Sequence, residues 1–320
     1  MAEATEEIKK IAVHRNPAIE AVLANSQLAI EYAFGLQCLT QYLTDLSLLS
    51  SGASYKDLGI SERRAATFSQ VISLDASGRP VYFKDRGLIY NGQLTPVNSF
   101  AVIPVKGFMQ TESSGGSGGV RGMRGTAEDL RAAYNNPNIS GILLDINSGG
   151  GEVMAMEVMN DALSVRNKPV VAHTYFAASA AYGTAAGADE IISLSEASRV
   201  GSIGAVVSLN RLALEEYANQ WLDIYGKNAP NKNREFRAMQ NGDFGPLQQV
   251  VNDATDMFQA KIKALRPLRG NDQKITDTIS GDMFTGTESK RRGLIDGIGG
   301  IEYALKRLQA WTKNQAYTKN

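Results

Sequence analysis

The sequence is poor in the residue types that build disulfides and most metal sites. Its 320 residues include one cysteine, Cys38, and two histidines, His14 and His173. A single cysteine excludes an intrachain disulfide and any zinc site that is built from several cysteines. With so few histidines as well, zinc and haem centres are not expected, and we predict no cofactor.

An excess of charge of either sign is also lacking. Lys and Arg number 33, Asp and Glu number 33, and the formal net charge at pH 7 is 0. A protein that binds nucleic acid through bulk positive charge would carry a basic excess. Nucleic acid is therefore not an expected partner.

Long apolar runs are absent. The most apolar stretch, residues 18–49, is interrupted by Glu20, Glu31 and Asp45, whereas a helix that spans a bilayer needs about 20 mostly apolar residues. Residues 1–16 are charged and do not contain the apolar segment of an export signal. We therefore expect no transmembrane segment and a reducing, cytoplasmic location.

Apolar residues in total are plentiful, at 43% of the chain, which is enough for the core of one large domain or two small ones. Helical patterns dominate residues 3–50 and 55–74. The stretch that follows, up to residue 99, is interrupted by glycine, proline and asparagine and suggests short strands. We expect residues 1–95 to be an added N-terminal segment, helical and irregular, of unknown role. Residues 96–312 would form the main domain and residues 313–320 a polar tail.

In the main domain, apolar strands alternate with helical segments. Buried strands are expected at residues 100–107, 141–146, 169–176 and 189–194. A helix is expected from Thr126, where Asp129 completes a capping-box pattern, and an alanine-rich helix at 177–187. This alternation predicts an α/β fold with parallel strands. From about residue 209 the chain is mainly helical, with one short strand at 222–225.

Three small-residue segments follow the ends of predicted strands. They are the glycine run 147–151, the segment 176–182 around Ser179, and the segment 199–204 around Ser202. Backbone N–H groups freed by a glycine run can hold a phosphate or an oxyanion. No nucleotide-binding glycine pattern is present, however, and each segment alone is equally consistent with a structural turn.

Ser179 stands among alanines at a predicted strand-to-helix junction. A serine placed there can present its Oγ atom where the helix dipole favours negative charge. Small neighbours would let a substrate backbone approach. A packed helix of alanine and serine explains the same residues without any chemistry.

In their order, the three segments resemble the motifs of the signal peptide peptidase A (SppA) family of Ser-Lys proteases, within the ClpP/crotonase-like superfamily. The family's Asn-Ser-Pro-Gly-Gly, Ala-Ala-Ser-Gly-Gly-Tyr and Thr-Gly-Ser-Ile-Gly match Asn147–Gly151, Ala177–Tyr182 and Val200–Gly204. Residues 281–299 resemble its closing glycine-rich pattern. The resemblance covers about residues 100–308. It implies a ClpP/crotonase-like spiral of parallel-sheet βαβ units with a helical C-terminal part.

The resemblance also implies a serine endopeptidase that works through an acyl-enzyme. Ser179 matches the nucleophile, and the backbone N–H groups of Gly150 and Ala180 would form the oxyanion hole. Ser202 would hydrogen-bond the lysine that serves as base and so orient it. The substrate would be an extended peptide or protein segment.

Two lysines compete for the role of base. A lysine base must be neutral, and since a free lysine titrates at about 10.4, burial or a neighbouring cation has to lower its pKa. In the family the lysine follows the Gly-Ser-Ile-Gly segment, a helix and a short strand. Lys232 fits this placement better, and Lys227 is the alternative base. Either lysine can instead be a solvated surface residue.

Other members of the superfamily use different groups. A Ser-His-Asp triad would need a histidine downstream of the serine, and both His14 and His173 precede it. Enoyl-CoA hydratases use acidic residues near the same turns, for which Glu152 is the candidate, although a carboxylate in the first turn of a helix is a simpler explanation.

A non-catalytic scaffold or CoA-binding protein of crotonase-like fold is a third hypothesis. It arises because Gly149, Ala180 and Ala181 differ from the family's residues. The small size of these residues is kept, and an oxyanion hole uses backbone groups, so the differences are compatible with an enzyme.

Partners and role follow from the resemblance alone. Single-domain members of the family form rings in which the lysine can come from the neighbouring subunit, so we expect a homo-oligomer with composite sites. Relatives without a membrane anchor include phage head-maturation proteases, which act in capsid assembly. That role would place the protein in the host cytoplasm or prohead, with capsid or scaffold proteins as substrates. A cytoplasmic peptidase for signal-peptide remnants is the alternative.

Overall fold

The structure is a computed structural model, and it describes residues 28–30, 51–52, 68–83, 85–113, 121–209, 217, 219–220 and 222–314. Most of the helical pattern expected before residue 68, and the polar tail from residue 315, lie outside the described residues. Two described parts of that N-terminal region are strands rather than helices. They are β1 (Leu28–Ile30) and β2 (Gln70–Leu74).

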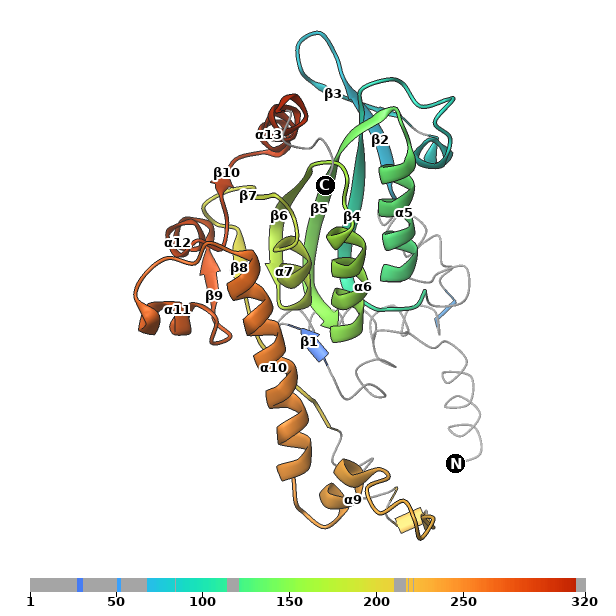
Figure 1. The fold of residues 1–320 in the computed structure, drawn as a ribbon, viewed down its shortest axis with the longest axis vertical. Helices are drawn as coiled ribbons and strands as arrows, with labels where there is room; N and C mark the ends of the chain where they lie inside the picture. The colour runs from blue at the N-terminus through green and yellow to red at the C-terminus, as the bar shows by residue number, and fades with distance from the viewer. Residues whose placement is uncertain are drawn as a thin grey trace.

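One mixed sheet of ten strands organises the described residues (Figure 1). Seven of them follow the order β10-β7-β6-β5-β4-β2-β3, and β1, β8 and β9 lie off this path, where β1 pairs with β5 and β8 pairs with both β6 and β9. From β10 to β4 neighbouring strands are parallel, and β2 and β3 add an antiparallel edge. This confirms the expected α/β class. The further strands are β3 (Pro80–Phe83), β4 (Ser99–Met109), β5 (Ile139–Glu152), β6 (Val170–Ala178), β7 (Glu190–Ser193), β8 (Arg199–Gly201), β9 (Met283–Thr285) and β10 (Gly297–Ile298).

Helices cover both faces of the sheet. Helices α5, α6 and α7 lie side by side over one face (Figure 1), and α13 packs on the other, where its apolar residues join those of the strands. The described helices are η1 (Arg86–Tyr90), α5 (Met123–Asn135), α6 (Val153–Ser164), α7 (Ala180–Ala185), α9 (Arg234–Gln240), α10 (Gly245–Leu265), α11 (Asp272–Thr278), α12 (Gly286–Arg292) and α13 (Ile301–Lys313).

The alternation of side chains along β5 explains why its apolar run is continuous. Ile142 and Leu144 belong to the core under α5, α6 and α7, whereas Leu143 belongs to the core under α13. All three are fully buried, and each such burial stabilises the fold by about 1.5–3 kcal/mol. A strand that is covered on both faces needs apolar residues at successive positions.

The capping box expected at Thr126 is wrong. Helix α5 starts earlier, with Gly122 as its N-cap, and no side chain caps it. Thr126 therefore lies inside the helix, and the Asp129 carboxylate accepts hydrogen bonds from Ser69 Oγ, at 2.5 Å, and from Arg121 Nη2, at 2.7 Å. This buried acid therefore fastens α5 to residues that a local motif does not consider.

The closing glycine-rich pattern supports helix α7 and strand β7. The hydroxyl of the buried Tyr182 donates to the carbonyl of Leu294 at 2.9 Å. Asp296 accepts the N–H of Ile191 at 2.8 Å and the guanidinium of Arg266 at 2.8 Å and 2.9 Å. The C-terminal part is thus tied to the helix that follows Ser179.

Replacing Asp296 with alanine should destabilise the fold by about 3 kcal/mol or more. The side chain of Arg266 is 3% exposed, and the substitution would leave this buried charge without its carboxylate. Urea unfolding should show a lower midpoint with an unchanged slope. Asp256→Ala, at an exposed position within α10, is the matched control and should change stability by no more than about 0.5 kcal/mol. Equal losses in the two variants would contradict this role.

Candidate active site

Ser179 occupies a strained turn between β6 and α7. Its φ is 55° and its ψ is −124°, a backbone conformation that residues with a side chain rarely adopt and that is maintained where the surroundings enforce it. The Ser179 N–H donates to the Gly201 carbonyl at 2.8 Å, and the Ser179 carbonyl accepts from Gly183 at 2.9 Å. Helix α7 begins only after the serine, so Ser179 is not part of a regular alanine-serine helix.

The side chain of Ser179 lines a cavity of about 270 Å³. Its Oγ lies 3.4 Å from the Gly204 carbonyl, to which it donates. The other described residues that line the cavity come from the segment after β8, from α10 and from the segment before β9, and are Ser202, Ile203, Gly204, Ala205, Val206, Thr255, Gln259, Ser280 and Gly281. None of these described residues carries a side chain that could serve as a general base.

The structure places Ser202 on the same cavity as Ser179. Strand β8 runs beside the end of β6, with Gly201 opposite Ala178. Ser202 has φ of 54°, and its N–H donates to the Asp282 carbonyl at 2.8 Å. A Cβ atom at Gly201 would lie 2.3 Å from the same carbonyl oxygen. The segment that supports the Ser179 turn is therefore itself fixed by the chain leading into β9.

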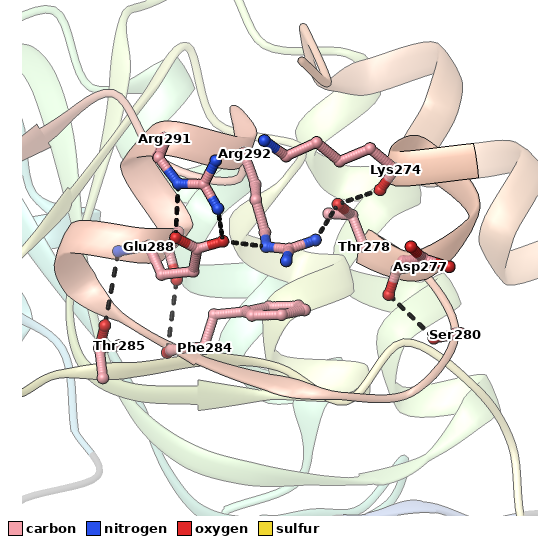
Figure 2. A network of polar contacts seen from close by, with 10 residues as sticks. Lys274, Asp277, Thr278, Ser280, Phe284, Thr285, Glu288, Arg291 and Arg292 are labelled. Carbon is pink, nitrogen blue, oxygen red and sulfur yellow. Dashed lines mark hydrogen bonds and ion pairs between the residues drawn. The ribbon is translucent and has the colours of Figure 1, made fainter. Parts of the chain in front are cut away.

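Strand β9 is held in turn by the polar network of Figure 2. The carboxylate of Glu288 accepts hydrogen bonds from Arg291 and Arg292, and Arg292 also donates to Thr278 Oγ1 at 2.8 Å. The Arg292 guanidinium lies 4.2 Å from the centroid of the Phe284 ring, within the range of a cation–π interaction. These contacts join α11, β9 and α12 into one unit behind β8.

The glycine run does not end the strand, contrary to expectation. Strand β5 continues through it to Glu152, because Gly150 and Gly151 still pair with Phe108 and Met109 of β4. A Cβ atom at Gly151 would lie 2.0 Å from the Met109 carbonyl oxygen. The close approach of β4 therefore accounts for glycine at 151.

The register of β5 and β6 brings Gly150 near the Ser179 turn. Ser148 pairs with Ala177 in the β5–β6 ladder, and Gly150 and Ser179 each follow that pair by two positions. Ala180 is the first residue of α7, so its N–H has no acceptor within the helix. The Gly150 N–H instead donates to Ser148 Oγ at 3.1 Å.

Neither candidate lysine meets Ser179 within one chain. Lys227 and Lys232 are exposed and do not line the cavity. Both precede α9, which lies at the far end of α10 from the sheet (Figure 1). The short strand expected at 222–225 is wrong as well. Leu222 and Ile224 are 88% and 90% exposed, so the apolar residues that favoured a strand have no partner strand in the described part of this chain.

Lys168 has the lowered pKa that a lysine base would need, but it lies in the wrong place. Burial lowers the pKa of Lys168 to about 8, and its Nζ donates to the Ala133 carbonyl at 2.7 Å. Lys168 precedes β6, whereas Ser179 follows it. The nine residues of this strand separate the two by roughly 30 Å.

The histidine alternative also lies away from the cavity. His173 is buried in the middle of β6, its Nε2 is 3.2 Å from the Gly299 carbonyl, and burial lowers its pKa. Its ring packs edge-on against Tyr175. His14 lies outside the described residues.

Glu152 has a role that the sequence did not reveal. Its Oε2 accepts the N–H and the hydroxyl of Thr111, at 2.8 Å and 2.5 Å. It therefore anchors Thr111, two residues beyond the end of β4. No spacing rule links the two residues, so a sequence motif could not have found this contact.

Residues 162–315 match the model of peptidase family S49. This part of the chain, a little under half of its length, is similar to that family. The matched range contains Ser179, Ser202 and both candidate lysines. Across the described residues no helix is both long and apolar enough to cross a membrane, and the same residues hold no group of three or more His, Cys, Asp or Glu side chains placed to bind a metal ion.

The chain is also similar to several curated proteins. A putative protease of Methanocaldococcus jannaschii is 32% identical over 178 residues, which is 54% of this chain and 56% of that protein. A putative signal peptide peptidase SppA of Enterococcus faecium is 28% identical over 192 residues, 56% of this chain and 53% of that protein. The capsid assembly protease C of Escherichia phage lambda is 27% identical over 208 residues, which is 63% of this chain and 47% of that protein. The chain thus spans about half the length of these relatives.

Proposed function

We propose that this chain is a serine endopeptidase that cleaves extended peptide segments through an acyl-enzyme on Ser179. The observation that carries the proposal is the strained turn that places this serine, at the start of α7, on a cavity. The strain is maintained by the hydrogen bond from the Ser179 N–H to Gly201, as expected for a side chain whose position matters for chemistry.

In the proposed mechanism a neutral Lys232 Nζ takes the proton of Ser179 Oγ, which attacks the peptide carbonyl. The tetrahedral oxyanion accepts hydrogen bonds from the N–H groups of Ala180 and Gly150. Collapse expels the amine, which takes the proton from the lysine, and water then hydrolyses the ester. Gly150 must release Ser148 Oγ to contribute, and each lost donor costs about 10²–10³ in rate. Ser202 would hold the lysine side chain.

The lysine would come from a neighbouring subunit of a homo-oligomer. Two features support this: the described cavity lining contains no base, and Lys232 is exposed far from the sheet. The exposed Leu222 and Ile224 just before it would be covered in the same contact. Burial against another subunit would also desolvate the lysine, as a neutral base requires. Lys227 is the alternative.

Capsid maturation is the role that we favour, with capsid or scaffold proteins as substrates in the host cytoplasm or prohead. The similarity to the capsid assembly protease of phage lambda, over 63% of this chain, supports it. The similarity to an SppA of Enterococcus faecium supports the second candidate, a peptidase for signal-peptide remnants. Peptides from capsid proteins and from cleaved signal sequences can be compared directly as substrates.

A serine-reactive fluorophosphonate probe tests the proposal. We expect mass spectrometry to find the label on Ser179 in the native protein, because only an activated serine reacts with such a probe. Urea-unfolded protein is the control and should stay unlabelled. Label on another serine, or none on the assembled native protein, would refute the proposed nucleophile and favour the scaffold hypothesis.

A further inference from the structure

Near Ser179, one edge of strand β5 is left unpaired by β6. A strand has two edges for hydrogen bonding. One edge of β5 pairs with β4 as far as the pair of Gly151 with Met109. The other edge pairs with β6, but only as far as the pair of Ser148 with Ala177. Beyond that pair the β6 chain turns away through Ser179 into α7, which leaves residues 150–152 of β5 unpaired by β6.

The chain's own strand β1 fills this edge. Ile30, Ala29 and Leu28 pair antiparallel with Gly150, Gly151 and Glu152. Since β4 already occupies one edge at Gly150 and Gly151, β1 must lie on the edge that β6 leaves. Figure 1 shows β1 beside the end of β5, at the side of the sheet where α7 begins.

We propose that residues 28–30 act as an internal competitor of the substrate and hold the active site in an inhibited state. This inference rests on the proposed peptidase function. A peptide that adds to the edge of a sheet binds mainly through its backbone, and residues 28–30 use the same backbone groups. Because the competitor is part of the chain, its effective concentration is high, and a substrate peptide must displace it to bind.

The direction of β1 agrees with a substrate-like position. Along β1 the chain runs from the partner of Glu152 to the partner of Gly150, and therefore toward the level of the Ser179 turn. The sequence of the strand is Leu-Ala-Ile. A peptide in an extended conformation is accordingly the substrate class that this edge would accept.

Peptide binding tests the proposal without requiring catalysis. A fluorescent peptide with the sequence of residues 24–36 is titrated by anisotropy against the full-length Ser179→Ala protein, with and without Ala29→Pro and Ile30→Pro. Successive residues of a strand direct their N–H groups to opposite edges. Two successive prolines therefore remove an N–H group from the edge that faces β5, whichever of the two residues donates there. We expect the peptide to bind the double-proline protein at least about tenfold more tightly. Affinities within twofold of each other would overturn the proposal.

Controls separate loss of β1 from general damage. Ala4→Pro with Thr5→Pro, a matched pair of prolines before β1, should leave the affinity unchanged. The triple substitution Leu28→Gly, Ala29→Gly and Ile30→Gly is a second variant, to be used if circular dichroism shows that the prolines impair folding. Hydrogen exchange should speed up at residues 150–152 in the β1 variants. Unchanged exchange there would show that β1 does not cover the edge and would overturn the inference.

Labelling of Ser179 in the same set of proteins, with the serine restored, distinguishes the two proposals. Faster labelling in the β1 variants supports both. Equal labelling in all of them keeps the peptidase function and overturns the inhibition. No labelling in any of them, together with tighter peptide binding, refutes the peptidase function while β1 remains the occupant of the edge.

Discussion

Replacing Ser179 with alanine should lower peptide hydrolysis by about 10⁴-fold or more, as loss of a nucleophile does in serine proteases. Alanine cannot form the ester, so the reaction would have to proceed by direct attack of water. The backbone should keep its turn, because the Ser179 N–H and carbonyl make the bonds that hold it and alanine keeps both groups. Circular dichroism and peptide binding should therefore match the wild type.

The control for this substitution is Ser164→Ala, at the exposed end of α6, where the hydroxyl only donates to the Asp161 carbonyl. It should leave the rate within about twofold of wild type. Hydrolysis that persists in Ser179→Ala at more than about a tenth of the wild-type rate would mean that another group attacks the substrate. The strained turn would then need a different explanation.

Lys232→Ala should abolish hydrolysis and labelling of Ser179, whereas Lys227→Ala should keep both. The two lysines are exposed on the same segment, so each is a matched control for the other in charge and surroundings. Without a base the serine hydroxyl stays protonated, and loss of general base catalysis costs about 10²–10⁴ in rate. Loss in Lys227→Ala alone would keep the mechanism and move the base to Lys227.

A mixture of the two inactive proteins should recover activity if the base comes from a neighbouring subunit. Ser179→Ala and Lys232→Ala subunits, dissociated together and reassembled, would form some sites that combine an intact serine with an intact lysine. With random assembly from equal amounts, about a quarter of all sites would be complete. No recovery, in oligomers shown by light scattering to be mixed, would rule out the composite site and require a base from the same chain.

The sequence predicted the features that depend on local pattern. The apolar run at 141–146 forms part of strand β5, and both faces of this strand are covered. Because both faces are buried, successive residues are apolar, and this continuous apolar pattern is visible in the sequence. The resemblance implied that Ser179 is the nucleophile and that Ser202 orients its lysine base, and in the structure both serines line one cavity. Motifs of this kind preserve the spacing between a strand end and the helix after it.

Features that depend on distant partners could not be predicted from pattern. The glycine run looks like a break, yet Gly150 and Gly151 remain in β5 because β4 lies beside them. The residues at 222–225 look like a strand but have no partner in the described chain, and 28–30 form a strand because the edge of β5 is free. In each case pairing with another segment, which no local rule contains, decides the structure.

The supports of the Ser179 turn come from residues that follow it in the sequence and are therefore synthesised after it. The carbonyl of Gly201 holds the turn, Asp282 and β9 hold the segment around Gly201, and Leu294 holds Tyr182. Domains form as their residues leave the ribosome, so a nascent chain that stops short of these supports carries the serine without its strained geometry. Reactivity of Ser179 would therefore appear only after the residues up to Leu294 have been synthesised.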